Sequence, residues 1–237
     1  MALIIDVETI GLPKCDNLSF GQLPPYDDLL SYEGARVVQV SMMLCNEHLE
    51  EIEFNDYVVK ADFIIGNSSF HGITNEISET NGTLFSKIAE KISVYLKQVS
   101  HIVAHNANFD ITIINSELYR LGLYSIIDEI NSKRILCTMK HTKMIVKARN
   151  KKQFIKYPSL AELYSYVFNK NIENAHNSKY DVINLLSIVK NMYDAKQLNF
   201  NDNIVYAPQM ITKEILENND EDKYKIITEG KAIETLI

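Results

Sequence analysis

The chain has 237 residues, 46% of them hydrophobic, and a formal net charge of −7 at pH 7, so it can bury one sizeable core. The apolar run before Asp6 is only four residues long, and the run 37–45 is interrupted by Gln39 and Ser41, which predicts neither a signal peptide nor a membrane span. Three cysteines, odd in number and without Cys-x-x-Cys spacing, exclude a disulfide framework and a zinc site: Cys15, Cys45 and Cys137. We therefore expect a soluble, intracellular and cytoplasmic protein.

The first predicted element is a buried strand at residues 2–7, and two acidic residues lie at its end. Side chains alternate in direction along a strand, so Asp6 and Glu8 point to the same side and can bind one cation together. Hard oxygen ligands of this kind suit Mg²⁺ or Mn²⁺ rather than zinc. An Asp-x-Glu pair is also common where acids merely close a strand, so the pair alone does not decide between these interpretations.

An irregular stretch follows at residues 12–35. It contains Pro13, Pro24, Pro25, Gly21 and Gly34 and carries no periodic apolar pattern. This stretch is equally compatible with a border of a functional site and with a surface excursion, because loops tolerate insertion.

The remaining elements are predicted from apolar periodicity and turn residues. We predict further strands at 36–45, 51–60, 100–105 and 133–137, and helices at 83–98, 107–121, 159–168 and 177–194. Ser159 with Glu162 forms a capping box that supports the start of the third helix. Three strands with short connections, followed by alternating strands and helices, indicate an α/β fold with a mixed sheet covered by helices.

A second group of polar residues follows the strand at 100–105. It includes His105, Asn106 and Asp110, and the last of these lies in an early turn of the helix predicted at 107–121. An acid in that position also complements the helix dipole, and the histidine and asparagine also fit capping or core roles.

A third group precedes the helix predicted at 177–194. The spacing of Val182, Leu185 and Val189 marks this helix as amphipathic. His176 then stands in the loop before the helix and Asp181 in its first turns, where both can face one cleft. A single histidine before a helix also fits a purely structural role. Asn177 or Ser178 is expected to cap the helix.

Basic residues are segregated within this acidic chain. Between Asn131 and Ala161 there are nine Lys and Arg residues and no Asp or Glu. Such segregation is typical of a surface that meets a polyphosphate backbone, although it also fits a solvated loop. We predict that the segment guides a nucleic acid through Lys140, Lys143, Lys147, Arg149, Lys151 and Lys152.

Taken together, these motifs resemble the DEDD superfamily of 3'-5' exonucleases, in its histidine-bearing branch. The matching segments are Asp6-Val7-Glu8-Thr9, His105-Asn106-Ala107 with Phe109-Asp110, His176 through Asp181, and His71-Gly72-Ile73-Thr74. The resemblance covers roughly residues 1–195 and leaves 196–237 as a C-terminal extension of unknown role. It implies a ribonuclease H-like fold, with a mixed five-stranded sheet flanked by helices.

The resemblance also implies the chemistry of the site. Two divalent cations, Mg²⁺ or Mn²⁺, would be held by the four carboxylates of Asp6, Glu8, Asp110 and Asp181. His176 would be the general base, which suits its unperturbed pKa of about 6.5. The terminal nucleotide would be contacted by Thr9, Ile10, His71, His105, Asn106 and Phe109.

The function implied by the resemblance is release of nucleoside monophosphates from DNA 3' ends, in proofreading or in trimming of single strands. An exoribonuclease of the same fold is the first alternative, because the catalytic motifs do not read the 2' hydroxyl. A docking subunit that serves a polymerase through its tail is the second. The expected partners are single-stranded DNA or DNA 3' ends, with RNA as an alternative, and a separate DNA polymerase; no membrane is expected.

Overall fold

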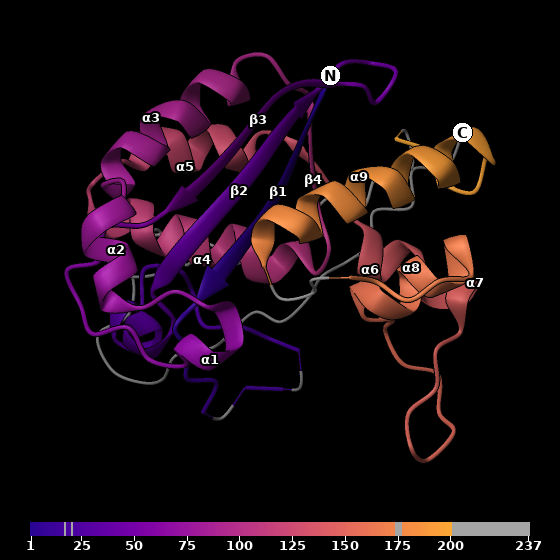
Figure 1. The fold of residues 1–237 in the computed structure, drawn as a ribbon, viewed down its shortest axis with the longest axis horizontal. Coiled ribbons are helices and arrows are strands. Elements are labelled where there is room, and N and C mark those ends of the chain that lie inside the picture. Colours follow the sequence, from indigo (N-terminus) through magenta and orange to yellow (C-terminus); the bar gives the residue numbers. More distant parts are fainter. Residues whose placement is uncertain (17, 20, 174–176, 201–237) are drawn as a thin grey trace, which may run out of the picture.

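The computed structural model describes residues 1–16, 18, 19, 21–173 and 177–200, which form a five-stranded sheet covered by helices (Figure 1). The strands are β1 Ala2–Thr9, β2 Val37–Cys45, β3 Glu51–Val58, β4 His101–Ala104 and β5 Arg134–Cys137. Their order in the sheet is β3-β2-β1-β4-β5. The pairs β1–β2 and β2–β3 are antiparallel, whereas β1–β4 and β4–β5 are parallel. The predicted mixed sheet of five strands is therefore confirmed.

The four predicted helices are also present, with boundaries within two residues of those expected. They are α3 Phe85–Leu96, α4 Ala107–Arg120, α8 Leu160–Phe168 and α9 Ser178–Asp194. The predicted capping box at the start of α8 is present in both directions. Sequence periodicity missed the shorter helices, because a segment of four to eight residues holds too few turns to show a period: η1 Leu29–Ala35, α1 Ser68–His71, α2 Asn75–Asn81, α5 Tyr124–Asn131, α6 Thr138–His141 and α7 Lys143–Val146.

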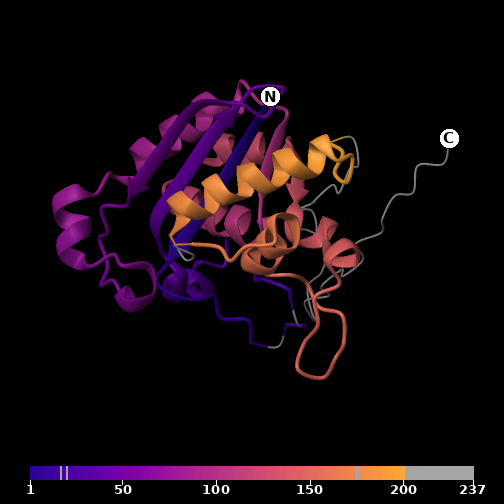
Figure 2. The ribbon, with the colours of Figure 1, turned by 45° about the vertical axis from the view of Figure 1, so that its right-hand side comes forward.

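One face of the sheet is covered by α3, α4 and α5, as Figures 1 and 2 show. Leu3, Ile5 and Val7 of β1 point into this layer, where they join the larger of the apolar clusters. The buried faces of α3, α4 and α5 supply many of its remaining side chains. Because side chains alternate along a strand, the even-numbered residues of β1 must lie on the opposite face.

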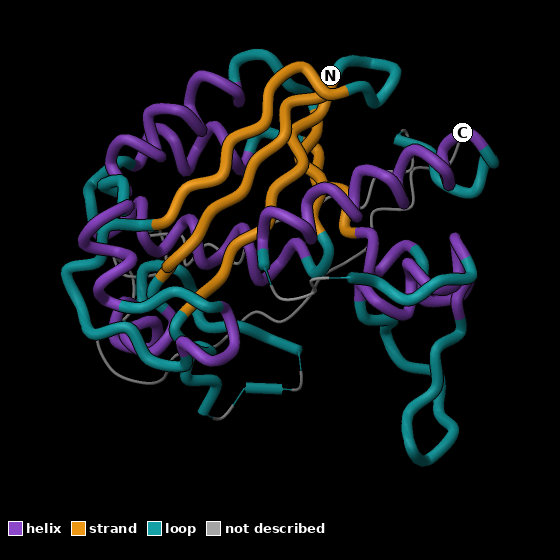
Figure 3. Tube along the Cα trace, in the orientation of Figure 1, coloured by secondary structure: helices purple, strands orange, loops and turns teal. Residues whose placement is uncertain are grey.

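The opposite face is covered by α8 and α9, and α9 crosses β1 and β2 directly (Figures 1 and 3). Ala2 and Ile4 of β1 pack into this second apolar cluster. Asp6 and Glu8 continue the same alternation and therefore lie on the α9 side, near the end of the strand. The apolar part of β1 thus fixes where the two acids are presented.

The irregular stretch after β1 is packed against the domain for part of its length. Its buried Tyr32 donates a hydrogen bond to the carbonyl of Pro24, and Arg120 of α4 donates to the carbonyl of Leu29. Beyond α9, Leu198 is buried and Phe200 packs against the cluster beneath α9. Residues 201–237 of the predicted C-terminal extension lie outside the described residues. Among those described, no helix is both long enough and apolar enough to cross a membrane.

Candidate active site

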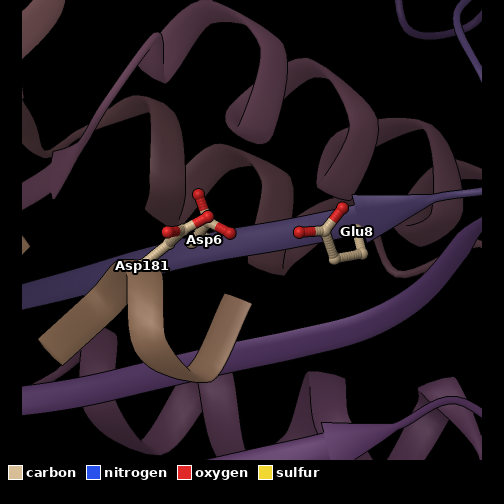
Figure 4. Close-up of side chains that lie close together, drawn as sticks. All are labelled: Asp6, Glu8 and Asp181. Atoms are coloured by element: carbon tan, nitrogen blue, oxygen red, sulfur yellow. The ribbon is translucent and has the colours of Figure 1, made fainter. Parts of the chain in front are cut away.

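Three carboxylates from two distant parts of the chain meet beside the sheet. Asp6 and Glu8 come from β1, and Asp181 comes from the first turn of α9 (Figure 4). Each offers one oxygen atom, and these three atoms lie within 4.8 Å of one another. The convergence follows from the packing of α9 across β1, which places its first turn over the acidic end of the strand.

A fourth carboxylate, that of Asp110, lies in the first turn of α4 and is only 2% exposed. Its Oδ1 accepts a hydrogen bond of 3.2 Å from the backbone N–H of Val7, the residue between the two acids of β1. Because the backbone N–H groups of a strand point sideways in the plane of the sheet, Asp110 approaches β1 from its edge, beside the two acids that the strand carries. The early helical turn predicted for this residue is confirmed.

Burial and mutual repulsion raise the pKa values of these acids. Burial raises the pKa of Asp6 well above its usual range, and the charges of Asp110, Asp181 and Glu8 add to the effect. The pKa of Glu8 is raised to about 7, by burial and then by the charge of Asp181. Burial raises the pKa of Asp110 to about 8, although its hydrogen bond from Val7 opposes that shift. The four acids are thus held in an arrangement that disfavours simultaneous ionisation.

Such an arrangement fits a divalent cation. Carboxylate oxygens are the ligands that Mg²⁺ and Mn²⁺ prefer, and a positive ion relieves the repulsion that burial would otherwise make costly. Asp6, Glu8 and Asp181 would hold it with the oxygens that already converge. Asp110 adds negative charge next to Asp6, whose pKa it helps to raise.

Two buried serines fix α9 to the sheet next to these acids. The hydroxyl of Ser178, at the first position of α9, lies 2.7 Å from the hydroxyl of Ser41. Ser41 is the cross-strand partner of Asp6, and its hydroxyl donates a hydrogen bond of 2.8 Å to Asp56 of β3, so its oxygen accepts from Ser178. The chain Asp56–Ser41–Ser178 therefore sets the position of the helical turn that carries Asp181.

Sequence reasoning missed the role of these serines. Asn177, rather than Ser178, is the cap residue of α9, and its side chain makes no capping hydrogen bond. The signal in the sequence was the interruption of the apolar strand at 37–45 by Gln39 and Ser41. All nine residues of β2 are buried, so a polar residue there needs a hydrogen-bonding partner.

His176, the predicted general base, lies outside the described residues, which resume at Asn177. Its role stays a prediction. Asn177 is the cap residue of α9, the helix that carries Asp181 in its first turn.

The two other histidines predicted to contact a nucleotide have both ring nitrogens engaged within the protein. Nδ1 of the buried His71 accepts from the N–H of Ile73, so its Nε2 donates to the carbonyl of Gly66, at 3.1 Å. Nε2 of His105 donates to the carbonyl of Pro158, at 3.1 Å, and Nδ1 lies 3.0 Å from the hydroxyl of Thr138. Burial lowers the pKa of His105 to about 4, which keeps the ring neutral. The predicted contacts of these two residues with a nucleotide would therefore be made by the carbon edges of the rings or by neighbouring backbone atoms.

The remaining predicted contacts lie around the ends of β1 and β4. Thr9 donates its hydroxyl hydrogen to the carbonyl of Gly11, and the N–H of Ile10 donates to the carbonyl of Arg36. Asn106 adopts a left-handed backbone conformation at the start of α4, with φ of 68°. Phe109 is partly buried against the core. These four contacts stay predictions.

The predicted guiding residues follow β5 in two groups. Lys140 and Lys143 lie in the short helices α6 and α7, and the ammonium of Lys143 sits 4.5 Å from the ring centre of Tyr157. The other four are exposed in the segment between α7 and α8: Lys147, Arg149, Lys151 and Lys152. The first group is therefore tied to the domain, and the second extends from it.

Comparison with known proteins gives a consistent relationship. The sequence model of the RNase T family, described as Exonuclease, matches residues 3–189. The epsilon subunit of DNA polymerase III from Buchnera aphidicola subsp. Schizaphis graminum is 27% identical over 206 residues, which cover 75% of this chain and 82% of that protein.

Solved structures share the fold at low sequence identity. Exonuclease I of Escherichia coli, in complex with a 5cy-dT13 oligonucleotide, is 15% identical and superposes with a TM-score of 0.62 over 81% of this chain. Exonuclease I of Methylocaldum szegediense is 18% identical, with a TM-score of 0.59 over 84% of the chain. The chain spans 40% and 42%, respectively, of the length of these two proteins.

Proposed function

The chain belongs to the RNase T exonuclease family and is a DEDD-type 3'-5' exonuclease; from this premise we propose that it releases nucleoside monophosphates from DNA 3' ends by two-metal hydrolysis. The observation that carries the proposal is the convergence of Asp6, Glu8 and Asp181 on one point. Asp110 contacts the same strand by accepting a hydrogen bond from the backbone N–H of Val7.

The residues of the chain divide the work between holding ions and moving protons. Asp6, Glu8 and Asp181 would hold divalent cations, with Asp110 completing the set on the other side of Asp6. When bound, such ions lower the pKa of water and neutralise charge that develops on the phosphodiester. His176 would take the proton from the attacking water, because its unperturbed pKa of about 6.5 lies near working pH.

DNA is the proposed substrate. The relative found by sequence is a DNA polymerase subunit, and the structure of E. coli exonuclease I was determined with an oligo-dT. Carboxylates that bind metal ions do not by themselves distinguish RNA from DNA, since that distinction depends on the 2' hydroxyl, so RNA is the alternative outcome of the same experiment.

The test uses purified protein with 5'-labelled single-stranded DNA and the matching RNA, with Mg²⁺, Mn²⁺ or chelator. Asp6→Ala and His176→Ala variants are run beside the wild type. The expected result is a ladder that shortens from the 3' end of the DNA and is lost with chelator and in Asp6→Ala. A ladder from RNA alone would show that RNA, and not DNA, is the substrate. Unchanged activity in His176→Ala would show that this residue is not the general base.

The same assay resolves the choice of metal, for which the oxygen ligands fit both Mg²⁺ and Mn²⁺. We propose Mg²⁺ or Mn²⁺ as the working ion, and titration of each from chelated protein compares them directly. Ca²⁺ provides the control, because it also takes oxygen ligands but with a looser coordination geometry.

A polymerase is the proposed protein partner, since the polymerase III epsilon subunit is itself named as a subunit of a polymerase. The C-terminal extension at 196–237 is the proposed attachment segment. The test is deletion of residues 201–237. We expect the shortened chain to keep its cleavage activity and to lose its binding to a separate polymerase chain. No cleavage of either polymer by the full chain, with partner binding retained, would favour a docking subunit instead.

A further inference from the structure

The segment between α7 and α8 forms a small hairpin that extends from the domain, and we call residues 147–156 the basic arm. In Figures 1 and 2 it projects away from the helices below α7. The two sides of the arm are joined by an antiparallel bridge between Arg149 and Ile155 and by a hydrogen bond of 2.8 Å from the N–H of Lys156 to the carbonyl of Ala148. The arm therefore has a defined backbone.

Its turn is fixed by one asparagine side chain. Oδ1 of Asn150 accepts hydrogen bonds from the N–H groups of Lys152, at 2.9 Å, and Phe154, at 3.0 Å. Backbone hydrogen bonds from Asn150 to Phe154 and from Gln153 to Asn150 close the same turn. An ordered turn of this kind holds the intervening side chains outward at a low cost in conformational entropy.

These outward side chains combine positive charge with an exposed aromatic ring. Phe154 is 66% exposed, which is unusual for so large an apolar ring in a folded domain. Among the described residues, no acidic side chain pairs with Lys147, Arg149, Lys151 or Lys152. A cationic surface with an aromatic platform is the combination that binds single-stranded nucleic acids, in which bases stack and phosphates meet charges.

The base of the arm is attached to the catalytic side of the domain. Pro158 accepts from Nε2 of His105, which lies next to the helix that carries Asp110. Lys156 forms an ion pair of 2.6 Å with Glu162 of α8, and α8 packs on α9, the helix that carries Asp181. The arm thus extends from the layer that covers the carboxylate-bearing face of the sheet.

We propose that the basic arm binds the single-stranded part of the substrate upstream of its 3' end, with Phe154 stacking on a base and the surrounding cations contacting phosphates. This proposal rests on the proposed function, since it names how that substrate is held. It assigns the arm to affinity for long strands and not to bond cleavage.

The first test uses fluorescence, because the chain contains no tryptophan. Phe154→Trp introduces a single one in the arm, and Leu121→Trp is the control, since Leu121 is 47% exposed at the opposite end of α4 from Asp110. Both are titrated with oligothymidylate in chelator, so that no strand is cleaved. Quenching in the arm variant alone is expected, and unchanged emission at saturating binding would overturn the proposal.

The second test separates substrate length from chemistry. Phe154→Ala is expected to raise KM for a long oligothymidylate by about tenfold, the equivalent of 1.4 kcal/mol, within the range of one base–aromatic stack. Its kcat, and its hydrolysis of the p-nitrophenyl ester of thymidine monophosphate, should stay at wild-type values. An unchanged KM for the long strand would contradict the stacking role.

The third test addresses the charges. One double variant carries Lys151→Glu and Lys152→Glu. The control double variant carries Lys97→Glu and Lys190→Glu, two exposed lysines elsewhere whose replacement changes the net charge by the same amount. Binding in chelator should depend less steeply on salt in the arm variant, by about 0.7 in the log–log slope for each phosphate that the arm no longer neutralises. Equal slopes in the two double variants would overturn the assignment of these lysines to phosphates. Because these binding tests need no cleavage, a chain that proved inactive would still report on the arm.

Discussion

The carboxylate site and the basic arm place their charges in opposite environments. The acids are held by long-range packing, with β1 and α9 separated by more than half of the chain, and Asp110 is buried. The arm is held by hydrogen bonds between residues a few positions apart, and its cations face solvent. Buried like charges cost stability and increase reactivity, whereas solvated charges cost little and act through attraction at longer range. Catalysis and affinity should therefore be separable by mutation.

The largest expected effect comes from the carboxylate site. Asp181→Asn removes one charge from the three converging oxygens while keeping the shape of the side chain. We expect kcat to fall by about 10³-fold, comparable to the loss of a well-placed electrostatic group in an active site. Steady-state cleavage of a 5'-labelled strand measures it, with Asp194→Asn, exposed at the other end of α9, as the control. Activity within tenfold of wild type would remove Asp181 from the site.

A second prediction concerns stability without metal. The pKa of Asp110 is raised to about 8, so its contribution to stability is fully present below its unfolded pKa, near 4, and is lost as pH rises towards 8. Asp110→Asn cannot ionise and keeps an oxygen that accepts from Val7. We expect the variant in chelator to be more stable than wild type near pH 8, by about 1.4 kcal/mol or more, the equivalent of one pKa unit.

Chemical denaturation in chelator, near pH 5 and near pH 8, measures this gain. The gain should grow between the two values, and Asp194→Asn should show no such growth. A divalent cation should stabilise the wild type and close the gap, because it binds only the folded site. A variant with the same stability difference at both pH values would contradict the repulsion argument.

A smaller effect is expected from the serines that position α9. Ser178→Ala breaks the hydrogen bond to Ser41 and leaves every carboxylate in place. We expect metal affinity or kcat to fall by about tenfold, as for other groups that orient ligands from outside. Ser187→Ala is the matched control, because this serine lies on the same helix and its hydroxyl donates to the carbonyl of Ile183 within it.

A double-mutant cycle distinguishes positioning from general destabilisation. If the two serines act through one hydrogen bond, Ser41→Ala with Ser178→Ala should be no worse than the poorer single variant. Metal affinity measured by calorimetry gives a readout separate from thermal stability. Additive losses in affinity would show that the serines act independently and would remove the proposed positioning role.

The carboxylate site was more accessible to sequence reasoning than the arm. Alternation along β1 predicted that Asp6 and Glu8 share a side, and periodicity predicted the helix that carries Asp181. Both are local rules that hold wherever an apolar face is buried. The meeting of the two segments follows from tertiary packing, which no local pattern contains; only the resemblance to a family suggested it.

The hidden features depend on partners distant in sequence. In the sequence, Ser41 only interrupts an apolar strand. Its role becomes clear in the fold, where its hydroxyl makes hydrogen bonds with Ser178 and Asp56. His105 could not be recognised as engaged within the protein, because its partners are Thr138 and Pro158, 33 and 53 residues away. In the arm, charge composition indicated the right segment, but the exposure of Phe154 is a property of the folded turn.

The smallest expected effect tests whether the arm contributes to folding. Lys156→Gln removes the ion pair with Glu162, whose side chains are 37% and 39% exposed, and leaves the cap of α8 intact. We expect the free energy of unfolding to change by less than about 1 kcal/mol, as for other exposed pairs. Glu117→Gln, which breaks the buried pair with Arg36, should cost about 3 kcal/mol under the same denaturation conditions. Similar losses in the free energy of unfolding in the two variants would mean that the base of the arm is part of the core. Mutations there would then change substrate affinity and folding stability together.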